Sequence, residues 1–293
     1  MYNIVFCGGD RRELIVMEAL SAAGYRIKAY GWPAEILPEK AEVVTDIAAA
    51  LREADACILP QPPLGREGQL ISMTGGPPIL RQEDISLLRP GTPVFCGVAP
   101  PYLTCAAGHC HIFAMADDDE LAAALAPASA EGAIAEALKL SDGLLAGKKA
   151  LLLGFGRIGR ELAWRLQGMG AALMILNRGQ ERADAAVAAG YAVADRSQLT
   201  SAALNADYIF NTVPAPVLDA HLIKRMPGNT CIIDVAAAPG GTDFNAAKRR
   251  GIKAVLAGGL PGRYAPRYAG EKMAACYLRL LSELLKEAHG DDA

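Results

Sequence analysis

The sequence has few of the features that mark disulfide-bonded or zinc-binding domains. Its seven cysteines are scattered through 293 residues, and none of them forms a C-x-x-C pair. An odd, scattered set of cysteines is typical of reduced thiols in a cytoplasm. Cys105, His109, Cys110 and His111 lie close together, but no second pair of ligands matches them. We therefore predict no metal site, since zinc takes four ligands.

A strong charge of one sign and a long apolar run are also missing. Lysine and arginine number 29 against 32 acidic residues, which gives a net charge of −3. This balance offers no electrostatic reason to expect a nucleic acid partner. No apolar run reaches the roughly 20 residues that cross a bilayer. The chain enters a strand-like segment without a basic leader, so we expect no signal peptide, no membrane span and a cytoplasmic location.

The residues that are abundant predict a two-domain α/β protein. Hydrophobic residues make up 52% of the chain, enough for two sizeable cores. Short apolar segments alternate with helical ones, which is typical of doubly wound parallel sheets. We predict a flavodoxin-like substrate domain over residues 1–126. Residues 127–293 are expected to form a Rossmann dinucleotide-binding domain, with a joining helix after Ser129 and a C-terminal helix, Glu271–His289, that packs back toward the first domain.

Expected strands follow the apolar segments. In the first domain they are Asn3–Cys7, Arg26–Tyr30, Ala56–Leu59, Pro93–Gly97 and His111–Ala114. In the second they are Lys149–Leu153, Leu173–Leu176, Tyr191–Val193, Tyr208–Asn211, Thr230–Asp234 and Lys253–Leu256.

The most informative segment is 149–160, a short apolar strand followed by a glycine turn and a helix. Gly154, Gly156 and Gly159 fit the pattern G-x-G-x-x-G. In that pattern the glycines permit a tight turn, the approach of a pyrophosphate and close packing of helix on strand. The helix N-terminus then holds the pyrophosphate. We expect this contact from Gly154, Phe155, Gly156, Arg157, Ile158 and Gly159.

The next strand ends without the acid that NAD-selective sites carry. Asn177 stands 18 residues after Gly159, where an Asp or Glu usually binds the ribose 2′-hydroxyl. Arg178 and Arg182 follow, and an arginine suits a 2′-phosphate. We therefore favour NADP, with Asn177, Arg178 and Arg182 around the phosphate. Solvated surface arginines are the simpler alternative.

Two later loops follow strand ends of the same domain. We expect their residues to line the nicotinamide end of the cofactor, because ligands in open α/β sheets bind outside the carboxyl ends of the strands. These residues are Thr212, Val213 and Pro214, and Gly259, Leu260 and Pro261.

The loops of the second half closely resemble those of the dipicolinate synthase family, in its A subunit. The segments that carry the resemblance are 238–244, 251–254, 259–266 and 269–270, with further likeness at 8–11, 131–134, 154–157 and 211–214. The middle of the first domain, 34–119, is similar only loosely, and Ala130 stands where a hydroxyl residue is expected.

The resemblance implies an NADP-dependent oxidation of a dihydrodipicolinate-like compound to dipicolinate, the diacid of bacterial endospores, in sporulation. It also implies a partner, the flavoprotein-like B subunit, and we expect a homo-oligomer, such as a homodimer. Carboxylates call for arginines. The candidates for binding the small dicarboxylate are Arg11, Arg12, Arg263 and Arg267, and no residue is identified as catalytic.

Other functions remain open. A D-specific hydroxyacid dehydrogenase needs a histidine acid/base, and the second half offers only His221 and His289. A shikimate-type enzyme uses a lysine in its first domain, where only Lys28 and Lys40 precede the joining helix. Both are disfavoured. The remaining alternatives are a nucleotide-binding scaffold that needs the B subunit for chemistry, and a dehydrogenase for another small carboxylated substrate.

Overall fold

The protein divides into two compact units in the computed structural model, which describes residues 1–61, 68–73, 79–99, 103 and 108–287. One unit comprises Met1–Ala124 and the last helix, α12 (Pro266–Glu287). The other is Leu125–Ala265. The sequence-based division at 126/127 left the last helix in the second domain, whereas its apolar face packs on the first unit. Cys105 and His289 lie outside the described residues.

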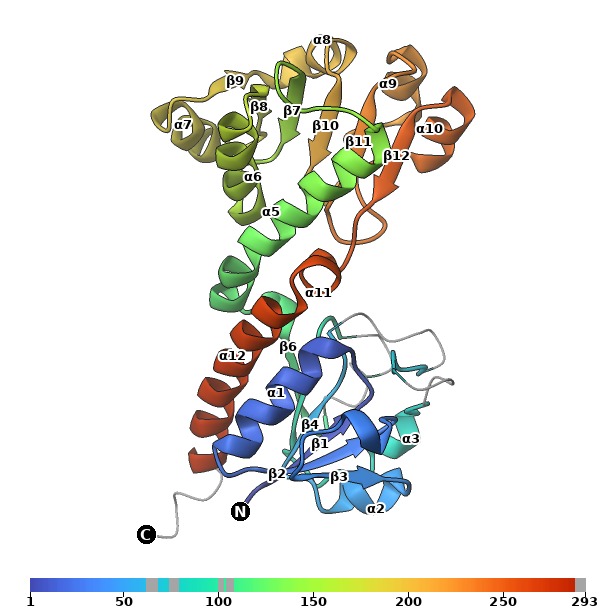
Figure 1. Cartoon of the computed structure of the whole chain (residues 1–293), viewed down its shortest axis with the longest axis vertical. Coiled ribbons are helices and arrows are strands. Elements are labelled where there is room, and N and C mark those ends of the chain that lie inside the picture. The colour runs from blue at the N-terminus through green and yellow to red at the C-terminus, as the bar shows by residue number, and fades with distance from the viewer. Residues whose placement is uncertain (62–67, 74–78, 100–102, 104–107, 288–293) are drawn as a thin grey trace. The chain divides into compact units, whose positions relative to one another are not determined.

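The first unit is built on a parallel sheet whose described strands have the order β3-β2-β1-β4-β5-β6 (Figure 1). In chain order they are β1 (Asn3–Cys7), β2 (Arg26–Tyr30), β3 (Ala41–Val44), β4 (Ala56–Ile58), β5 (Pro93–Cys96) and β6 (His111–Ala114). Strand β3 was not among the predicted strands, because this edge strand has no buried residue. With β3 the order is that of a Rossmann sheet rather than the flavodoxin-like order.

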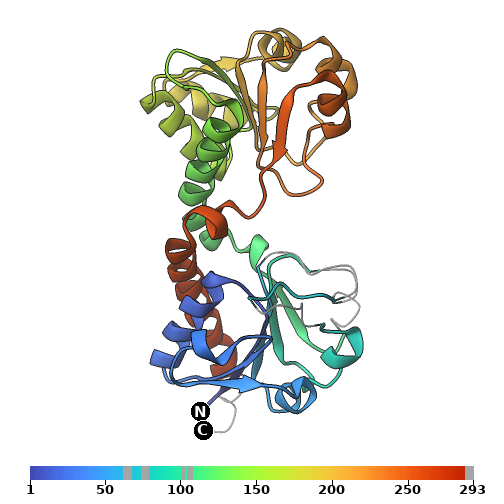
Figure 2. The ribbon, with the colours of Figure 1, turned by 45° about the vertical axis from the view of Figure 1, so that its right-hand side comes forward.

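Helices cover both faces of this sheet. Helix α1 (Arg11–Ala22) and α12 lie side by side on one face, as both ribbon views show (Figures 1 and 2). A Cβ on Gly270 of α12 would lie 2.8 Å from the Ile15 Cβ of α1, so the two helices touch closely. The Tyr277 ring meets the Phe95 ring edge-on, with centroids 5.4 Å apart. Helices α2 (Ile47–Arg52) and α3 (Gln82–Ile85) pack on the opposite face.

The second unit repeats the design with the order β12-β11-β10-β7-β8-β9. Its strands are β7 (Lys149–Leu153), β8 (Ala172–Leu176), β9 (Ala192–Ala194), β10 (Tyr208–Asn211), β11 (Cys231–Asp234) and β12 (Lys253–Leu256). All of them pair in parallel. The predicted strands are found within two residues. The central apolar runs, those of β7, β10 and β11, are buried on both faces of the sheet.

The helices of the second unit divide between the two faces of its sheet. Those on one face are α5 (Asp119–Ser141), α6 (Arg157–Gly168) and α7 (Gln180–Ala188). Those on the other are α8 (Leu199–Leu204), α9 (Ala220–Arg225) and α10 (Phe244–Arg250). A short helix, α11 (Leu260–Tyr264), follows β12. The expected α/β class with two doubly wound parallel sheets is confirmed.

Helix α5 begins at Asp119, well before the joining helix that the sequence predicts after Ser129. Pro127 lies inside it, and the Ser129 hydroxyl donates to the Leu125 carbonyl oxygen over 3.1 Å instead of capping a new helix. By length and composition α5 is apolar enough to cross a membrane, which the search for apolar runs had not found. Half of the apolar stretch is buried inside the protein, where Ala133 and Ala137 join the core, and this burial accounts for its composition.

Candidate functional site

The turn between β7 and α6 closes only with glycine at two of its positions. Gly154 has φ +94°, and its N–H donates to the Leu176 carbonyl oxygen over 2.9 Å. A Cβ there would lie 2.3 Å from the Thr212 Oγ1. A Cβ on Gly159 would lie 2.4 Å from the Gly154 carbonyl oxygen. Helix α6 therefore starts directly against the end of β7, as a dinucleotide turn requires.

The N-terminus of α6 begins at a glycine. The N-cap is Gly156, which has no side chain to cap the first helical N–H groups. These groups carry the positive end of the helix dipole, and a phosphate binds there readily. Ile158 and Arg157 begin the helix, and Phe155 is buried against Tyr191. The residues present thus fit the pyrophosphate of a dinucleotide.

The corresponding turn of the first unit is closed. The Asp10 carboxylate accepts from the Arg12 N–H over 2.9 Å, and Glu13 accepts from the Asp10 N–H over 2.7 Å. The N–H groups of Gly8 and Gly9 donate to backbone carbonyls of Tyr30 and Ile71. Because these donors are occupied, this glycine turn has no cradle for a phosphate.

Asn177 braces the dinucleotide turn from the end of β8. Its Oδ1 accepts from the Phe155 N–H over 3.2 Å, and its Nδ2 donates to the Gly179 carbonyl oxygen over 2.7 Å. Arg178 and Arg182 are both exposed. The Arg182 guanidinium reaches the turn, since its Nη1 lies 3.7 Å from the Cβ position of Gly156. Within the described part of the chain, neither arginine forms a salt bridge.

The loop after β10 is held by a buried amide. The Asn211 Nδ2 donates to the Val213 carbonyl oxygen, and its Oδ1 accepts from the Val213 N–H, each over 3.1 Å. The Thr212 hydroxyl donates to the Leu153 carbonyl oxygen over 2.9 Å. Thr212, Val213 and Pro214 thus lie beside the glycine turn. Asn211 was not predicted as a site residue, although its place as a polar residue at the end of an apolar strand could have indicated it.

Asp234 holds the loop after β11 in the same way. Its carboxylate is fully buried and accepts from the Ala236 N–H, the Gly241 N–H and the Thr242 hydroxyl over 2.7–3.1 Å. A Cβ on Gly241 would lie 2.6 Å from the Asn211 Nδ2, so the two loops touch. Asp234 also escaped sequence analysis. The two buried polar residues thus hold the loops at the carboxyl ends of β10 and β11 through hydrogen bonds.

The loop after β12 leads into α11. Gly259 is its N-cap with φ +63°, and Leu260 is buried in the core of the second unit. Pro261 is in the first turn. Arg263 and Tyr264 follow, and both bind the carboxylate of Glu136 on α5. Arg263 therefore lies in a polar cluster rather than alone in solvent.

The other arginine candidates belong to the first unit and have different surroundings. The Arg12 side chain is buried, and its Nε and Nη2 donate to the two Asp10 oxygens over 3.0 and 2.8 Å. Arg11 is exposed at the start of α1. The Arg267 side chain is 89% exposed and pairs with Glu271 one turn along α12. Arg12 is thus engaged in the fold, while Arg11 and Arg267 face solvent.

Beside Arg12 the structure shows a buried acid that sequence analysis missed. The Glu13 carboxylate is fully buried, and burial together with the nearby Asp10 charge raises its pKa to about 7. Its Oε1 accepts from the Gln61 N–H over 3.3 Å. The Gln61 Nε2 in turn donates to the Tyr277 hydroxyl over 3.0 Å. These groups lie where β1 and β4 end, the switch point of the sheet.

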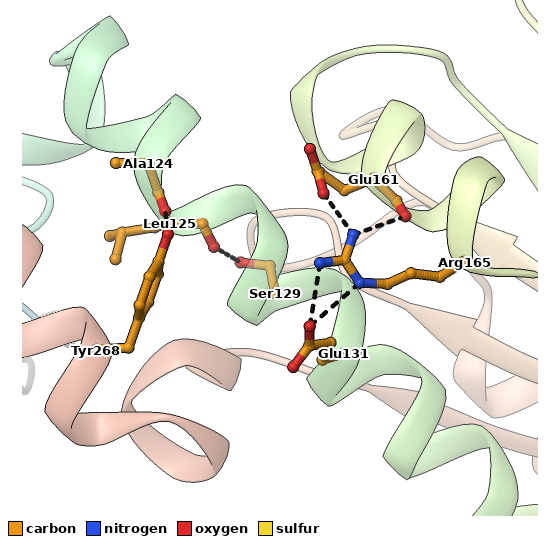
Figure 3. A network of polar contacts seen from close by, with 7 residues as sticks. All are labelled: Ala124, Leu125, Ser129, Glu131, Glu161, Arg165 and Tyr268. Atoms are coloured by element: carbon orange, nitrogen blue, oxygen red, sulfur yellow. Dashed lines mark hydrogen bonds and ion pairs between the residues drawn. The ribbon is translucent and has the colours of Figure 1, made fainter.

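Two further contacts hold α5 (Figure 3). In the second unit, Arg165 of α6 donates to Glu131 and Glu161, and its side chain is only 14% exposed. In the first unit, the Tyr268 hydroxyl donates to the Ala124 carbonyl oxygen over 2.9 Å. One guanidinium satisfies both acids of the Arg165 cluster, which indicates a structural role for it.

Comparison with known families agrees with this geometry. Residues 3–115 match the family described as the N-terminal domain of the dipicolinate synthase A subunit. Residues 119–240 match the NAD binding domain of D-isomer specific 2-hydroxyacid dehydrogenases. The second match contains the glycine turn and the loop after β10. It indicates a nicotinamide dinucleotide as the cofactor of this unit.

Whole-chain comparison extends the likeness to both units. The chain is 27% identical over 289 residues to the A subunit of dipicolinate synthase from Bacillus subtilis, covering 97% of each chain. The crystal structure of its counterpart from Bacillus halodurans is 28% identical, with TM-score 0.90 over 96% of this chain and 97% of the other. The crystal structure of the Bacillus subtilis protein is 27% identical, with TM-score 0.88 over 98% of this chain and 97% of the other. The resemblance seen in the loops is therefore confirmed, and both units of this chain are similar to the dipicolinate synthase A subunit.

Proposed function

We propose that this protein is an NADP-linked oxidoreductase, the A subunit of a dipicolinate synthase that oxidises dihydrodipicolinate to dipicolinate in sporulation. The observation that carries the proposal is the glycine turn before α6, with two exposed arginines beside it. The chain is also similar over 97% of its length to the A subunit of dipicolinate synthase from Bacillus subtilis. Because the N–H donors in the glycine turn of the first unit are occupied, we assign the cofactor to the second unit.

The preference for NADP rests on charge. An acid at the end of β8 would bind a ribose 2′-hydroxyl and repel a 2′-phosphate. Asn177 carries no charge, and its amide is occupied with Phe155 and Gly179. Arg178 and Arg182 supply two cations at this place. Guanidinium groups bind a phosphate through charge-assisted hydrogen bonds.

The remaining cofactor contacts follow from the loops. We assign the pyrophosphate to residues 154–159. The nicotinamide end is assigned to Thr212–Pro214 and Gly259–Pro261, whose backbone is held by Asn211 and by the core position of Leu260. A nicotinamide held by these residues would supply the hydride acceptor for the substrate ring. The chain itself has to hold the diacid and orient its ring, because aromatisation favours the product.

For the diacid we retain arginine as the recognition group. Arg263 is the strongest candidate, because its guanidinium is held by Glu136 and stays half-exposed. Arg11 and Arg267 are exposed and remain weaker candidates. Arg12 is the weakest, since Asp10 occupies its guanidinium on two sides. One hydrogen of the ring leaves as the hydride, and the other leaves as a proton to solvent.

The partner, oligomer and compartment belong to the same proposal. The relatives are named as the A subunit or A chain of a synthase, and this name implies a second subunit. We propose that this second subunit is the flavoprotein-like B subunit of the synthase. We also propose that the chain forms a homodimer and that it is located in the cytoplasm.

The test is the formation of NADPH and dipicolinate by the purified chain, supplied with freshly generated dihydrodipicolinate and NADP⁺. Turnover by the chain alone supports the proposal that the chain is itself the oxidoreductase. Turnover only after the B subunit is added supports the scaffold alternative. A third outcome is tight binding of NADP⁺ with no turnover of dihydrodipicolinate in either mixture, together with turnover of another carboxylated compound from a substrate panel. That outcome would change the proposed substrate and keep the proposed reaction class.

A further inference from the structure

Glu136 is a buried acid shared by two neighbours on α11. Its side chain is 8% exposed, and one oxygen, Oε1, accepts both from the Tyr264 hydroxyl over 2.8 Å and from the Arg263 guanidinium. A buried carboxylate is stable only where charge or hydrogen bonds compensate it. Glu136 therefore fixes the places of two side chains that lie 127 and 128 residues away in sequence.

The backbone of α5 allows α11 to approach closely at the same point. Gly132 lies one helical turn before Glu136. A Cβ there would lie 2.9 Å from the Leu260 Cβ and 3.0 Å from the Tyr264 Cδ2. Leu260 is itself 2% exposed. Close packing at Gly132 and the polar contact of Glu136 thus both hold α11 against α5.

The two side chains held by Glu136 stay accessible. The Arg263 side chain is 49% exposed, and Tyr264 is 40% exposed. The Arg263 guanidinium lies over the Tyr264 ring, 5.4 Å from its centroid, which further restricts it. A guanidinium has five N–H donors, and Glu136 contacts only Nη2. A second edge remains for another carboxylate.

The Arg165 cluster shows what a purely structural pair on the same helix looks like. Glu131 of α5 also binds an arginine, but Glu161 closes on that guanidinium as well, and the arginine is only 14% exposed (Figure 3). No edge of Arg165 is offered to a ligand. Arg263, with one acid partner and half of its side chain exposed, differs in this respect.

We propose that Glu136 is a positioning residue that holds Arg263 to bind one of the two carboxylates of the diacid. Tyr264 supports the site, because its hydroxyl donates a hydrogen bond to Glu136 and its ring packs against the Arg263 guanidinium. The inference rests on the proposed function and deepens it, since it makes this cluster the part of the protein that distinguishes a diacid from a monoacid.

The test compares two ligands that differ by one carboxylate. Dipicolinate and picolinate, the pyridine dicarboxylate and monocarboxylate, are titrated by calorimetry into protein saturated with NADP⁺. Wild type should bind dipicolinate at least about tenfold more tightly, the ratio of one charge-assisted contact. Glu136→Gln and Arg263→Lys should each reduce that ratio to about one to three, chiefly by weakening dipicolinate.

Controls separate this role from a loss of structure. Glu131→Gln removes a carboxylate from an arginine on the same helix and should leave the ratio unchanged. The affinity for NADP⁺ should stay within about twofold of wild type in all variants. If Glu136→Gln does not fold, the comparison of wild type with Arg263→Lys tests the proposal. Tyr264→Phe keeps the ring and should lower dipicolinate affinity about threefold.

The outcomes are distinct. Wild type that binds no dipicolinate overturns the proposed function and the inference with it. Wild type that binds dipicolinate, with variants that keep the ratio or weaken both ligands equally, overturns the inference alone.

Discussion

The backbone N–H of Phe155 donates a hydrogen bond to the Asn177 Oδ1 over 3.2 Å. This bond ties the turn after β7 to the end of β8, the two places between which the adenosine half of a dinucleotide lies in Rossmann folds. Asn177 thus shapes the turn, and the charge that a 2′-phosphate needs comes from its neighbours. Cofactor choice can therefore be tested separately from turn structure.

Arg178→Ala should weaken NADP⁺ binding and leave NAD⁺ binding nearly unchanged. Loss of one charge-assisted contact is expected to cost about 1.5–3 kcal/mol. Calorimetry with both nucleotides on wild type, on this variant and on Arg182→Ala measures the effect. Arg196→Ala, an exposed arginine of the same unit, serves as control. Equal affinity of wild type for the two nucleotides would remove the NADP assignment.

Asn177→Asp should reverse the preference toward NAD⁺. The carboxylate keeps an acceptor for the Phe155 N–H, loses the donor to the Gly179 carbonyl oxygen, and repels a 2′-phosphate while binding a 2′-hydroxyl. We expect at least a tenfold fall of NADP⁺ affinity, about 1.4 kcal/mol. The ratio of the two dissociation constants is the measurement. A parallel loss for both nucleotides would show that the change acts on the turn alone.

Gly159→Ala should destabilise the second unit and abolish tight dinucleotide binding. Its Cβ would lie 2.4 Å from the Gly154 carbonyl oxygen, and overpacking of this kind costs about 1–3 kcal/mol. Gly168→Ala at the end of the same helix has nothing within 4 Å of its Cβ. That variant should be neutral or gain up to about 1 kcal/mol. Thermal unfolding and NADP⁺ titration of both variants compare them directly, and similar behaviour would contradict the close-packing argument.

Glu13 should make the first unit less stable as the pH rises toward neutrality. Burial raises its pKa from 4.5 to about 7, so folding favours the protonated carboxyl. This contribution is fully present below pH 4.5 and is lost as the pH rises through about 7, a change of about 3 kcal/mol. The groups that face it are Asp10, Arg12, Gln61 and Tyr277. Hydrogen bonds and charge from Arg12 outweigh desolvation and lower the pKa of Asp10, which titrates in a more acidic range.

Glu13→Gln removes this titration and should flatten the dependence of the free energy of unfolding on pH between about 5 and 7.5. Urea unfolding in a Trp164→Phe background isolates the fluorescence of Trp32, whose indole donates to the Gly8 carbonyl oxygen. Glu18→Gln, an exposed acid on the same helix, is the control. Curves of the same slope for wild type and Glu13→Gln would contradict a neutral pKa.

The strands and the dinucleotide turn were predictable because their causes are local. Apolar runs such as 149–153 form buried parallel strands wherever they are placed, and the spacing of Gly154, Gly156 and Gly159 describes a turn that needs no distant partner. The loops after β10 and β12 were found for the same reason, from turn residues that directly follow apolar strands. The likeness to the dipicolinate synthase A subunit rests on these same short segments.

What only the tertiary structure decided depends on residues far apart in sequence. The apolar face of α12 suits several surfaces, and its packing on α1 assigned it to the first unit. Arg12 and Arg263 read alike in sequence, yet Asp10 encloses the first guanidinium, and Glu136, from another helix, leaves half of the second exposed. Burial and pairing are properties of the packed fold, and they determine whether a charge serves structure or a ligand.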